Sequence, residues 1–261
     1  MKNKIDVCLT PAIVDLFDLS NKQVVIIDVF RATSAMCVFL NNGGERVIPV
    51  SNIEDAIKYK NDINPFCEKK YLVAAERNGA VVPGFDLGNS PLSYHNQDFR
   101  DVSLAITTTN GTLAINKAQM AGYGMLLASF LNVSSIVDYI SSCNNDVLIV
   151  CSGWKGRLCM EDILLAGLLS EKILLNNQFY CNSDSVLLSK NMYNLAKSNL
   201  FQFLEDSAYR KRMNLDEDVK YCLQIDTMDL VPVWSRFKSD KESLQIGPGF
   251  FYANKNSKIT L

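Results

Sequence analysis

Short apolar runs that alternate with amphipathic stretches are the feature that most constrains the fold of this 261-residue chain. Seven runs rich in Val, Ile and Leu are predicted to be strands, and they cover residues 4–9, 24–29, 46–50, 71–75, 102–107, 124–128 and 147–151. Continuous apolar strands separated by helical segments are typical of a mainly parallel or mixed sheet that helices cover. We therefore expect an α/β protein with a layered α/β/α architecture.

Helical patterns lie between and after these runs. Ser51-Asn-Ile-Glu54 has the form of a capping box and predicts a helix that starts at Ser51. Further helices are predicted from about 132, from about 160 and over about 184–213, and a closing strand is expected at 231–234 before a Gly-Pro-Gly turn at 247–249. We predict one α/β unit over 1–261, with a motif-bearing core at about 24–167 and a helical and closing segment at about 180–261. The pattern leaves an arrangement in two lobes open.

The charge balance excludes several classes of partner. The chain has 26 Lys plus Arg against 28 Asp plus Glu, so its net charge of −2 favours neither nucleic acid nor an anionic membrane as a partner. The basic run at 209–213 is followed by three acidic residues, and we interpret it as a solvated helix end. No apolar run approaches the roughly 20 residues that span a bilayer, and the N-terminus has no secretory pattern. We expect a cytoplasmic protein and leave open whether it forms a homo-oligomer.

The single histidine and the eight cysteines limit the kinds of metal site and of acid–base catalysis that this chain can form. His95 is the one histidine, so a multi-histidine metal centre is excluded, and acid–base catalysis must depend on carboxylates, Lys, Tyr or Cys. The eight cysteines contain no CxxC pair, which argues against a zinc ribbon and fits a reducing compartment. Sites rich in carboxylates suit Mg²⁺ better than Zn²⁺.

Three segments have the same design, in which an apolar strand is followed by a polar loop and then a helix. They are VVIIDVFRATSAM at 24–36, SLAITTTNGTLAI at 103–115 and VLIVCSGWKGRLCMED at 147–162. Loops at the carboxyl ends of parallel strands gather where ligands bind, and their free N–H groups attract anions. The three loops together predict a phosphorylated or otherwise anionic small substrate.

The first segment offers a carboxylate and an arginine. Asp28 ends an apolar strand, where it needs a cation or hydrogen bonds, and Arg31 can bind a phosphate or sulfonate in a bidentate manner. Thr33 and Ser34 would add hydroxyl and amide donors at the helix start. The alternative is an internal Asp28–Arg31 ion pair with a threonine cap.

The second segment and the long loop before it supply further candidates. In the run 107–112, the hydroxyls, amides and Gly111 favour oxyanion binding, although capping alone explains Thr109 or Thr112. In the loop 74–91, Glu76 directly follows a strand and is a candidate Mg²⁺ ligand. Asp86 is either a second ligand or a turn residue.

The third segment allows two interpretations. Cys151 and Arg157 have the C-x5-R spacing of thiolate phosphatases, in which a loop wraps around phosphate. Alternatively, Cys151 continues a buried strand and is an ordinary core residue. Glu161 and Asp162 open the next helix, either for capping or to bind a metal.

Taken in series, IDVFRATSA, AERNG, GFDLGNSP, TTTNGT, ASFLN and CSGWKGRLCMEDILLAG resemble the 2-phosphosulfolactate phosphatase family of coenzyme M biosynthesis. The resemblance implies an α/β/α Mg²⁺-dependent acid phosphatase that hydrolyses 2-phospho-3-sulfolactate to 3-sulfolactate and phosphate. That substrate carries three acidic groups, which Arg31, Arg77 and Arg157 could bind. The motif positions implicate Asp28, Arg31, Thr33, Glu76, Arg77, Asp86, Thr108, Asn110, Gly111, Cys151, Gly153, Glu161 and Asp162.

Our working hypothesis is phosphoryl transfer assisted by one Mg²⁺, held by Asp28, Glu76 and either Glu161 or Asp162. Arg31 and the amides of residues 109–112 would hold the phosphoryl group. The attacking group is water, Asp28 or Cys151, and Phe30 replaces the second aspartate of the DxDxT pattern that an aspartyl-phosphate route would use. The alternatives are a related small phospho-acid as substrate, a cysteine phosphatase using 151–157, and a non-catalytic module that binds an anionic metabolite.

Overall fold

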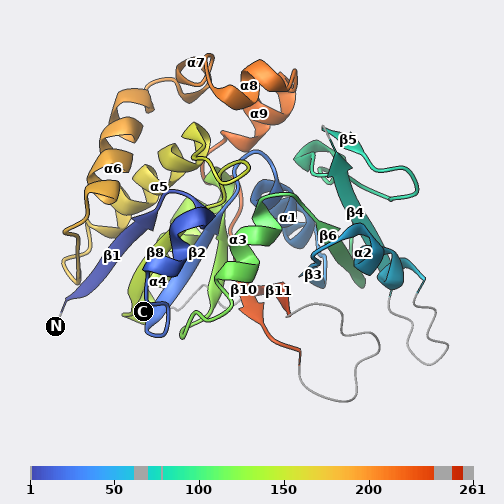
Figure 1. Ribbon diagram of the computed structural model, residues 1–261, viewed down its shortest axis with the longest axis horizontal. Helices are drawn as coiled ribbons and strands as arrows, with labels where there is room; N and C mark the ends of the chain where they lie inside the picture. The colour runs from blue at the N-terminus through green and yellow to red at the C-terminus, as the bar shows by residue number, and fades with distance from the viewer. Residues whose placement is uncertain (1, 62–69, 78, 238–248, 255–261) are drawn as a thin grey trace.

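A single mixed sheet runs through the molecule (Figure 1). The computed structural model describes residues 2–61, 70–77, 79–237 and 249–254. The strands follow the order β5-β4-β6-β3-β11-β10-β7-β2-β8-β1-β9. Their bounds are β1 Asn3–Cys8, β2 Lys22–Ile27, β3 Arg46–Pro49, β4 Lys70–Arg77, β5 Ala80–Val81, β6 Val102–Thr107, β7 Met125–Ala128, β8 Asp146–Cys151, β9 Phe179–Tyr180, β10 Val231–Ser235 and β11 Phe250–Asn254. The seven predicted strands and the closing strand are confirmed.

The sheet consists of two parallel halves that an antiparallel hairpin joins. In one half β2 pairs with β7 and β8, and β8 pairs with β1; in the other, β6 pairs with β3 and β4. The C-terminal strands β10 and β11 form the hairpin between the halves. Each hairpin strand pairs with one half of the sheet through a single residue pair near the start of the neighbouring strand. Val233 of β10 pairs with Leu126 of β7, and Phe251 of β11 pairs with Val47 of β3.

Helices cover both faces of this sheet. They are α1 Ala32–Asn41, α2 Ile53–Lys60, α3 Gly111–Lys117, α4 Val133–Cys143, α5 Met160–Ile173, α6 Asp184–Ala196, α7 Leu200–Phe203, α8 Ala208–Arg212 and α9 Asp216–Cys222, with short 3-10 turns at Pro11–Leu16, Pro91–Ser93 and Phe130–Asn132. The predicted α/β/α class is confirmed. None of the helices in the described ranges is both long enough and apolar enough to cross a membrane.

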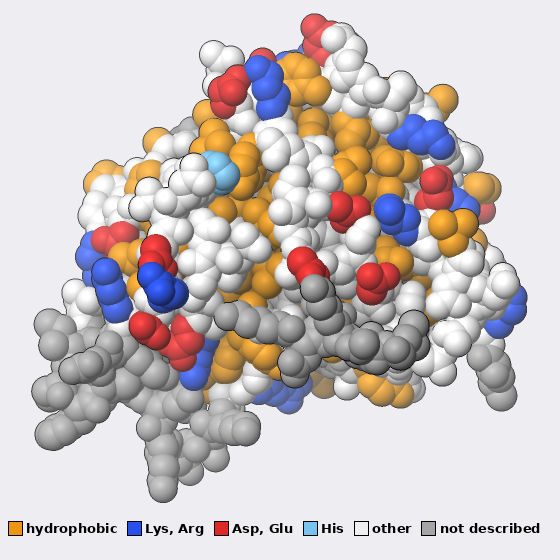
Figure 2. Space-filling view, turned by 180° about the vertical axis from the view of Figure 1, so that it is seen from behind, with side chains coloured by type: hydrophobic (Ala, Val, Ile, Leu, Met, Phe, Trp, Pro, Cys, Tyr) orange, Lys and Arg blue, Asp and Glu red, His pale blue; other side chains and the backbone are white. Residues whose placement is uncertain are grey.

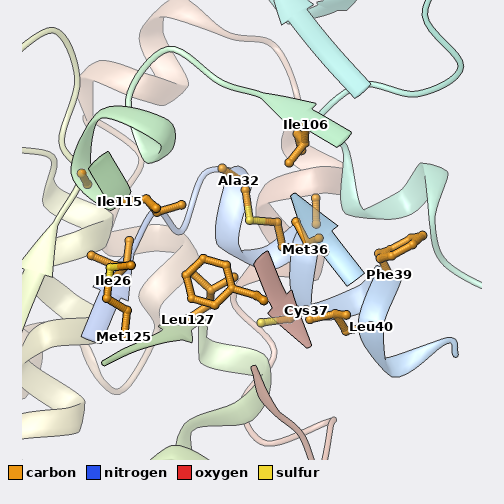
Figure 3. Close-up of a cluster of buried hydrophobic side chains, with 14 of the residues drawn as sticks. Ile26, Ala32, Met36, Cys37, Phe39, Leu40, Ile106, Ile115, Met125 and Leu127 are labelled. Carbon is orange, nitrogen blue, oxygen red and sulfur yellow. The ribbon is translucent and has the colours of Figure 1, made fainter. Parts of the chain in front are cut away.

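Alternating side chains of the strands build the two faces of the core. Val24 and Ile26 of β2 belong to a cluster with α1, whereas Val25 and Ile27 belong to a cluster with α4 and α5. This follows from the two-residue period of a strand. Figure 3 shows residues of α1, among them Met36, in the first cluster together with Ile26.

Two helices differ locally from the prediction. The helix predicted to start at Ser51 begins at Ile53, because the Asn52 side chain, rather than that of Ser51, accepts the hydrogen bond from the amide of Asp55, at 2.7 Å. The predicted 184–213 helix is divided into α6, α7 and α8. Most of the 247–249 turn lies outside the described residues, as does Cys67, and the seven described cysteines are free.

Candidate active site

A pocket of about 600 Å³ lies where the loops after β2, β4, β6 and β8 come together. Helices α7–α9 lie at this end of the molecule, and the β10–β11 hairpin lies at the other (Figure 1). The pocket wall takes residues from each of the three predicted strand–loop–helix segments, from the end of β4 and from α8. The structure therefore brings together loops that the sequence separates by more than a hundred residues.

Asp28 and Glu161 are two buried carboxylates in the wall of this pocket. Asp28 is 8% exposed, and burial, with a contribution from the charge of Glu76, raises its pKa to about 6. Burial also raises the pKa of Glu161 to about 7, and the charge of Asp28 adds to the shift. The two acids therefore oppose each other's ionisation, which is the arrangement that a bound cation relieves.

Asp162 lies behind this pair and joins two loops. Its carboxylate accepts hydrogen bonds from the amide of Val29 at 3.0 Å and from the amide of Gly153 at 2.9 Å. Burial, together with the charges of Asp28 and Glu161, raises its pKa well above the usual range. Asp162 is absent from the described pocket wall, so its position suits fixing the loops after β2 and β8.

Arg31 reaches the pocket but is already paired with two carboxylates. Its guanidinium, 4% exposed, lies 2.8 Å from Asp218 of α9 and 3.3 Å from Glu76. The peptide bond before it, between Phe30 and Arg31, is cis. The sequence considered an ion pair with Asp28, but the acids that pair with Arg31 are these two. Asp218, which Ser90 also contacts at 2.5 Å, was not predicted.

Thr33 and Ser34 have their hydroxyls inside the turn rather than in the pocket wall. Thr33 Oγ1 accepts from the amide of Asp28 at 3.1 Å and donates to its carbonyl at 2.9 Å. Ser34 Oγ donates to the carbonyl of Val29 at 2.9 Å. The physical consequence is that these hydroxyls hold the loop of Asp28 in shape instead of being free for phosphate.

Glu76 and Asp86, the two metal-ligand candidates of the segment 74–91, lie in different surroundings. Glu76 lies in the pocket wall, where it also accepts from the amide of Gly79 at 2.8 Å. Arg77 is exposed in the same wall. Asp86, predicted as either a second ligand or a turn residue, is not brought to this wall: its carboxylate pairs with Lys60 at 2.8 Å and accepts from the amide of Val73 at 3.0 Å.

The loop after β6 supplies the predicted hydroxyl and amide wall. Residues 107–110 line the pocket, while Thr108 and Thr112 exchange hydrogen bonds that close the start of α3. At Gly111 a Cβ atom would lie 2.9 Å from Asp28 Oδ2, so glycine lets the helix start approach that carboxylate. Asn110 Oδ1 accepts from the amide of Lys155 at 2.9 Å and links this loop to the next.

The loop after β8 does not have the form of a thiolate phosphate-binding loop. Cys151 is fully buried among the side chains under α5, and burial raises the pKa of its thiol well above the usual range. The exposed Arg157 turns back on Trp154, whose amide donates to its carbonyl at 2.8 Å. Gly153, at φ 56°, permits this tight turn. Neither Cys151 nor Arg157 belongs to the described pocket wall, because Cys151 lies in the core and the segment after it turns back on itself.

Part of the pocket wall comes from the segment 209–213, which the sequence did not predict to belong to the site. Tyr209, Arg212 and Met213 line the pocket, so this segment, which the sequence predicted as a solvated helix end, also contributes to the pocket wall. Tyr209 and Arg212 are three residues apart and hence lie on one face of α8. That spacing of an aromatic and a basic side chain was the available signal. Asn89 and Trp154 are further wall residues that were not predicted.

Comparison with known proteins agrees with this geometry. The family model described as 2-phosphosulpholactate phosphatase matches residues 8–236. The chain belongs to this family. The matched range includes the predicted loops and also α8 and α9, which carry Tyr209, Arg212 and Asp218.

Curated relatives of this family match most of the chain. A protein of Caldanaerobacter subterraneus subsp. tengcongensis is 40% identical over 221 residues, which are 82% of this chain and 88% of the relative. A protein of Clostridium novyi is 35% identical over 88% of this chain and 96% of its own length, and one of Thermotoga maritima is 34% identical over 81% and 88%. Each is named as a probable 2-phosphosulfolactate phosphatase, which is a phosphoric monoester hydrolase.

The acidic groups of this 2-phosphosulfolactate phosphatase family member can be compared with the ligand sets that metal ions take. Among the described residues, no three Asp, Glu, His or Cys side chains are grouped closely enough to hold an ion. Mg²⁺ is commonly bound by only one or two carboxylates, with substrate phosphate and water completing its shell. The pair Asp28 and Glu161 fits that donor set, whereas Glu76 is already engaged by Arg31.

Proposed function

We propose that this family member hydrolyses 2-phospho-3-sulfolactate, or a closely related small phospho-acid, to the free hydroxy acid and inorganic phosphate. The observation that supports the proposal most strongly is the pair of buried carboxylates, Asp28 and Glu161, in one pocket with the hydroxyl- and amide-rich loop 107–110. Family membership supports the reaction class, and with it a small phosphorylated substrate. The resemblance to the coenzyme M family suggests the pathway.

We further propose that Asp28 and Glu161 hold Mg²⁺. When bound, the ion would offset the charge of the two acids and polarise a phosphoryl oxygen. Both side chains offer oxygen atoms, which are the ligands that a hard cation prefers. Their raised pKa values also mean that cation binding must displace protons near neutral pH.

The remaining wall would position the substrate. Thr109 and Asn110 precede α3, and their backbone N–H groups have no hydrogen-bond acceptor in the described part of the chain. These donors suit the oxygens of a phosphoryl group in the manner of an oxyanion hole. Arg31, held by Asp218 and Glu76, presents an oriented guanidinium in the same pocket wall. Because Cys151 is buried behind the pocket, we propose water as the attacking group.

The test is phosphate release from 2-phospho-3-sulfolactate, measured with Mg²⁺ and with a chelator, alongside a panel of other phospho-acids. We expect Asp28→Asn to lower kcat by at least about 100-fold, because removing a group that stabilises transition-state charge costs roughly 10²–10³. Asp86→Asn is the matched control, since this acid lies outside the pocket wall. Full activity of Asp28→Asn would refute the metal assignment.

A further inference from the structure

Two buried polar atoms in the pocket wall have no partner. Five buried side-chain atoms in the described ranges lack one, and only two of their residues, Asn89 and Tyr209, line the pocket. Tyr209 is 7% exposed, and its hydroxyl is the unpaired atom. A buried hydroxyl without a hydrogen bond is costly, so native proteins pair such groups with protein, water or ligand. The orphaned hydroxyl in this wall therefore points to a ligand.

The chemical character of Tyr209 makes it a hydrogen-bond donor. Its ring packs against Phe30 at 4.9 Å between centroids, which fixes the side chain at the pocket. Burial raises its pKa above the usual range, so the hydroxyl keeps its proton at neutral pH. An anionic ligand would accept a charge-assisted hydrogen bond from this hydroxyl.

Arg212, on the same face of α8, offers a positive charge outside the ion pairs of the described residues. Its guanidinium stacks on Trp154 at 3.8 Å from the ring centroid, and the Lys155 ammonium lies 4.6 Å from the same ring. Arg212 makes no ion pair with any described carboxylate, in contrast to Arg31, which has two. A planar guanidinium on an aromatic ring is pre-organised for binding a carboxylate or sulfonate.

From these observations we infer that α8 is the specificity element of the enzyme: Tyr209 and Arg212 bind the acidic group that the substrate keeps after the phosphate leaves. The inference rests on the proposed function and extends it. The carboxylates and the loop 107–110 surround the reacting end, and the pocket, at about 600 Å³, has room for more than a phosphoryl group. A second fixed anion, such as a sulfonate, would give the Tyr209 hydroxyl a hydrogen-bond partner and would form an ion pair with Arg212, whose guanidinium donates to the Ala208 carbonyl at 3.0 Å.

The experiment compares substrates that do and do not carry a second acidic group. We would measure kcat and KM for 2-phospho-3-sulfolactate, 2-phospholactate and p-nitrophenyl phosphate with Arg212→Gln and Tyr209→Phe. We expect Arg212→Gln to raise KM about tenfold or more for the substrate with the sulfonate and to raise that for p-nitrophenyl phosphate much less. Tyr209→Phe should shift KM in the same direction. A similar loss on 2-phospholactate would assign the contact to the carboxylate, and a loss confined to 2-phospho-3-sulfolactate would assign it to the sulfonate.

The neighbouring residue provides the matched control. Lys211→Gln removes the same charge from the same helix at an exposed position that pairs with Asp206 outside the pocket. Lys211→Gln should leave every KM unchanged. Arg212→Lys should give a KM between those of the wild type and Arg212→Gln, because lysine keeps the positive charge but lacks the bidentate guanidinium. Equal losses on all three substrates, or no change on any, would overturn the inference.

A binding measurement separates this inference from the proposed function. If the wild-type chain releases phosphate from none of these esters, the proposed function fails, yet calorimetry with 3-sulfolactate still tests α8. Binding that weakens about tenfold in Arg212→Gln, but not in Lys211→Gln, supports the inference. Equal binding by the two variants contradicts it.

Discussion

Asp28 illustrates how one residue can reduce stability in order to serve a site. It follows a fully buried strand end, and the charges of Glu76, Glu161 and Asp162 lie around it. Its hydrogen bonds, from the amides of Ala32 and Gly111, offset only part of the burial effect on its pKa. Such an arrangement is expected at a functional site, where a bound ligand compensates an otherwise unfavourable charge.

The raised pKa of Asp28 predicts a pH-dependent stability difference. The carboxyl has a pKa of about 6 when folded against a model value of 3.8, so the folded state binds the proton more tightly. Stability therefore falls as pH rises from about 4 through about 6. An asparagine side chain does not ionise, so in the presence of a chelator Asp28→Asn should match the wild type near pH 4. By pH 8 it should exceed the wild-type free energy of unfolding by on the order of 2 kcal/mol.

Urea denaturation at several pH values checks this prediction. Asp138→Asn is a suitable control for the loss of one carboxylate, because Asp138 is exposed on α4. Mg²⁺ should stabilise the wild type at pH 8 more than Asp28→Asn. A variant that is less stable than the wild type at pH 8 without metal would contradict the reasoning.

Cys151 is expected to matter for packing and not for turnover. It is fully buried in the core under α5. Cys151→Ala should lower the free energy of unfolding by about 1–2 kcal/mol, because it leaves a small cavity, while kcat stays within about twofold. Cys37→Ala, at a fully buried position on α1, should behave alike. A hundredfold loss of kcat in folded Cys151→Ala alone would restore the thiolate hypothesis.

At the scale of elements, a buried ion pair fastens α9 to the start of α1. Asp218 of α9 pairs with Arg31, which precedes α1, at 2.8 Å, and both side chains are buried. Removing one member of a buried pair leaves the other charge uncompensated. The helical segment 200–222 is therefore coupled to the pocket through one carboxylate as well as through Tyr209.

This coupling predicts a combined loss of stability and activity. Asp218→Asn should lower the free energy of unfolding by about 2–4 kcal/mol, since Glu76 is then the one ion-pair partner of Arg31 among the described residues. It should also lower kcat, because the guanidinium loses its orientation. Glu217→Gln removes an exposed charge that pairs with Lys220, and it should cost less than about 1 kcal/mol. Equal effects of the two substitutions in urea denaturation would rule out the coupling.

Across the whole molecule, the C-terminal hairpin joins two halves that both contribute to the pocket. It contacts the beginnings of β7 and β3, at the end of the molecule away from α7–α9 (Figure 1). Phe251 of this hairpin is fully buried, and its ring lies 4.9 Å from that of Trp234. The integrity of the sheet therefore depends on residues far from the pocket.

Substitutions in the hairpin test this role. Phe251→Ala should lower the free energy of unfolding by about 3–4 kcal/mol, as expected when a buried aromatic side chain is removed. Its neighbour Tyr252 is 38% exposed, so Tyr252→Ala should cost less than about 1.5 kcal/mol. Thermal or urea denaturation measures both. A similar cost for the two would show that the hairpin does not carry the junction.

The molecular surface agrees with the charge balance of the chain. On the face shown in Figure 2, the described Lys and Arg side chains alternate with Asp and Glu instead of forming one basic area. The charges on this face are thus mixed, while the cations Arg77, Lys155 and Arg212 meet at the pocket. A small anion is attracted by such a local group, whereas a long polyanion needs an extended basic surface.

Local patterns explain which features could be predicted. The strands, the helix starts near 132 and 160, and the polar loops after β2, β6 and β8 follow from neighbouring residues, and the structure has each of them. The error at Ser51 has the same local origin, because two adjacent side chains compete to cap one helix. Glu76 and the loop 107–110 reach the pocket because the carboxyl ends of strands are where loops meet.

The sequence by itself determined the layered α/β/α class and the three polar loops, because periodicity and loop chemistry are properties of contiguous residues. Only the tertiary structure decided which charges are free. Arg31 and Asp218 are 187 positions apart and neutralise each other, Asp86 turns to Lys60, and Cys151 is enclosed in the core. Whether a charged or polar group is available to a ligand depends on partners that packing brings from distant parts of the chain. That is why the place of Tyr209 and Arg212 in the pocket wall became clear from the folded molecule.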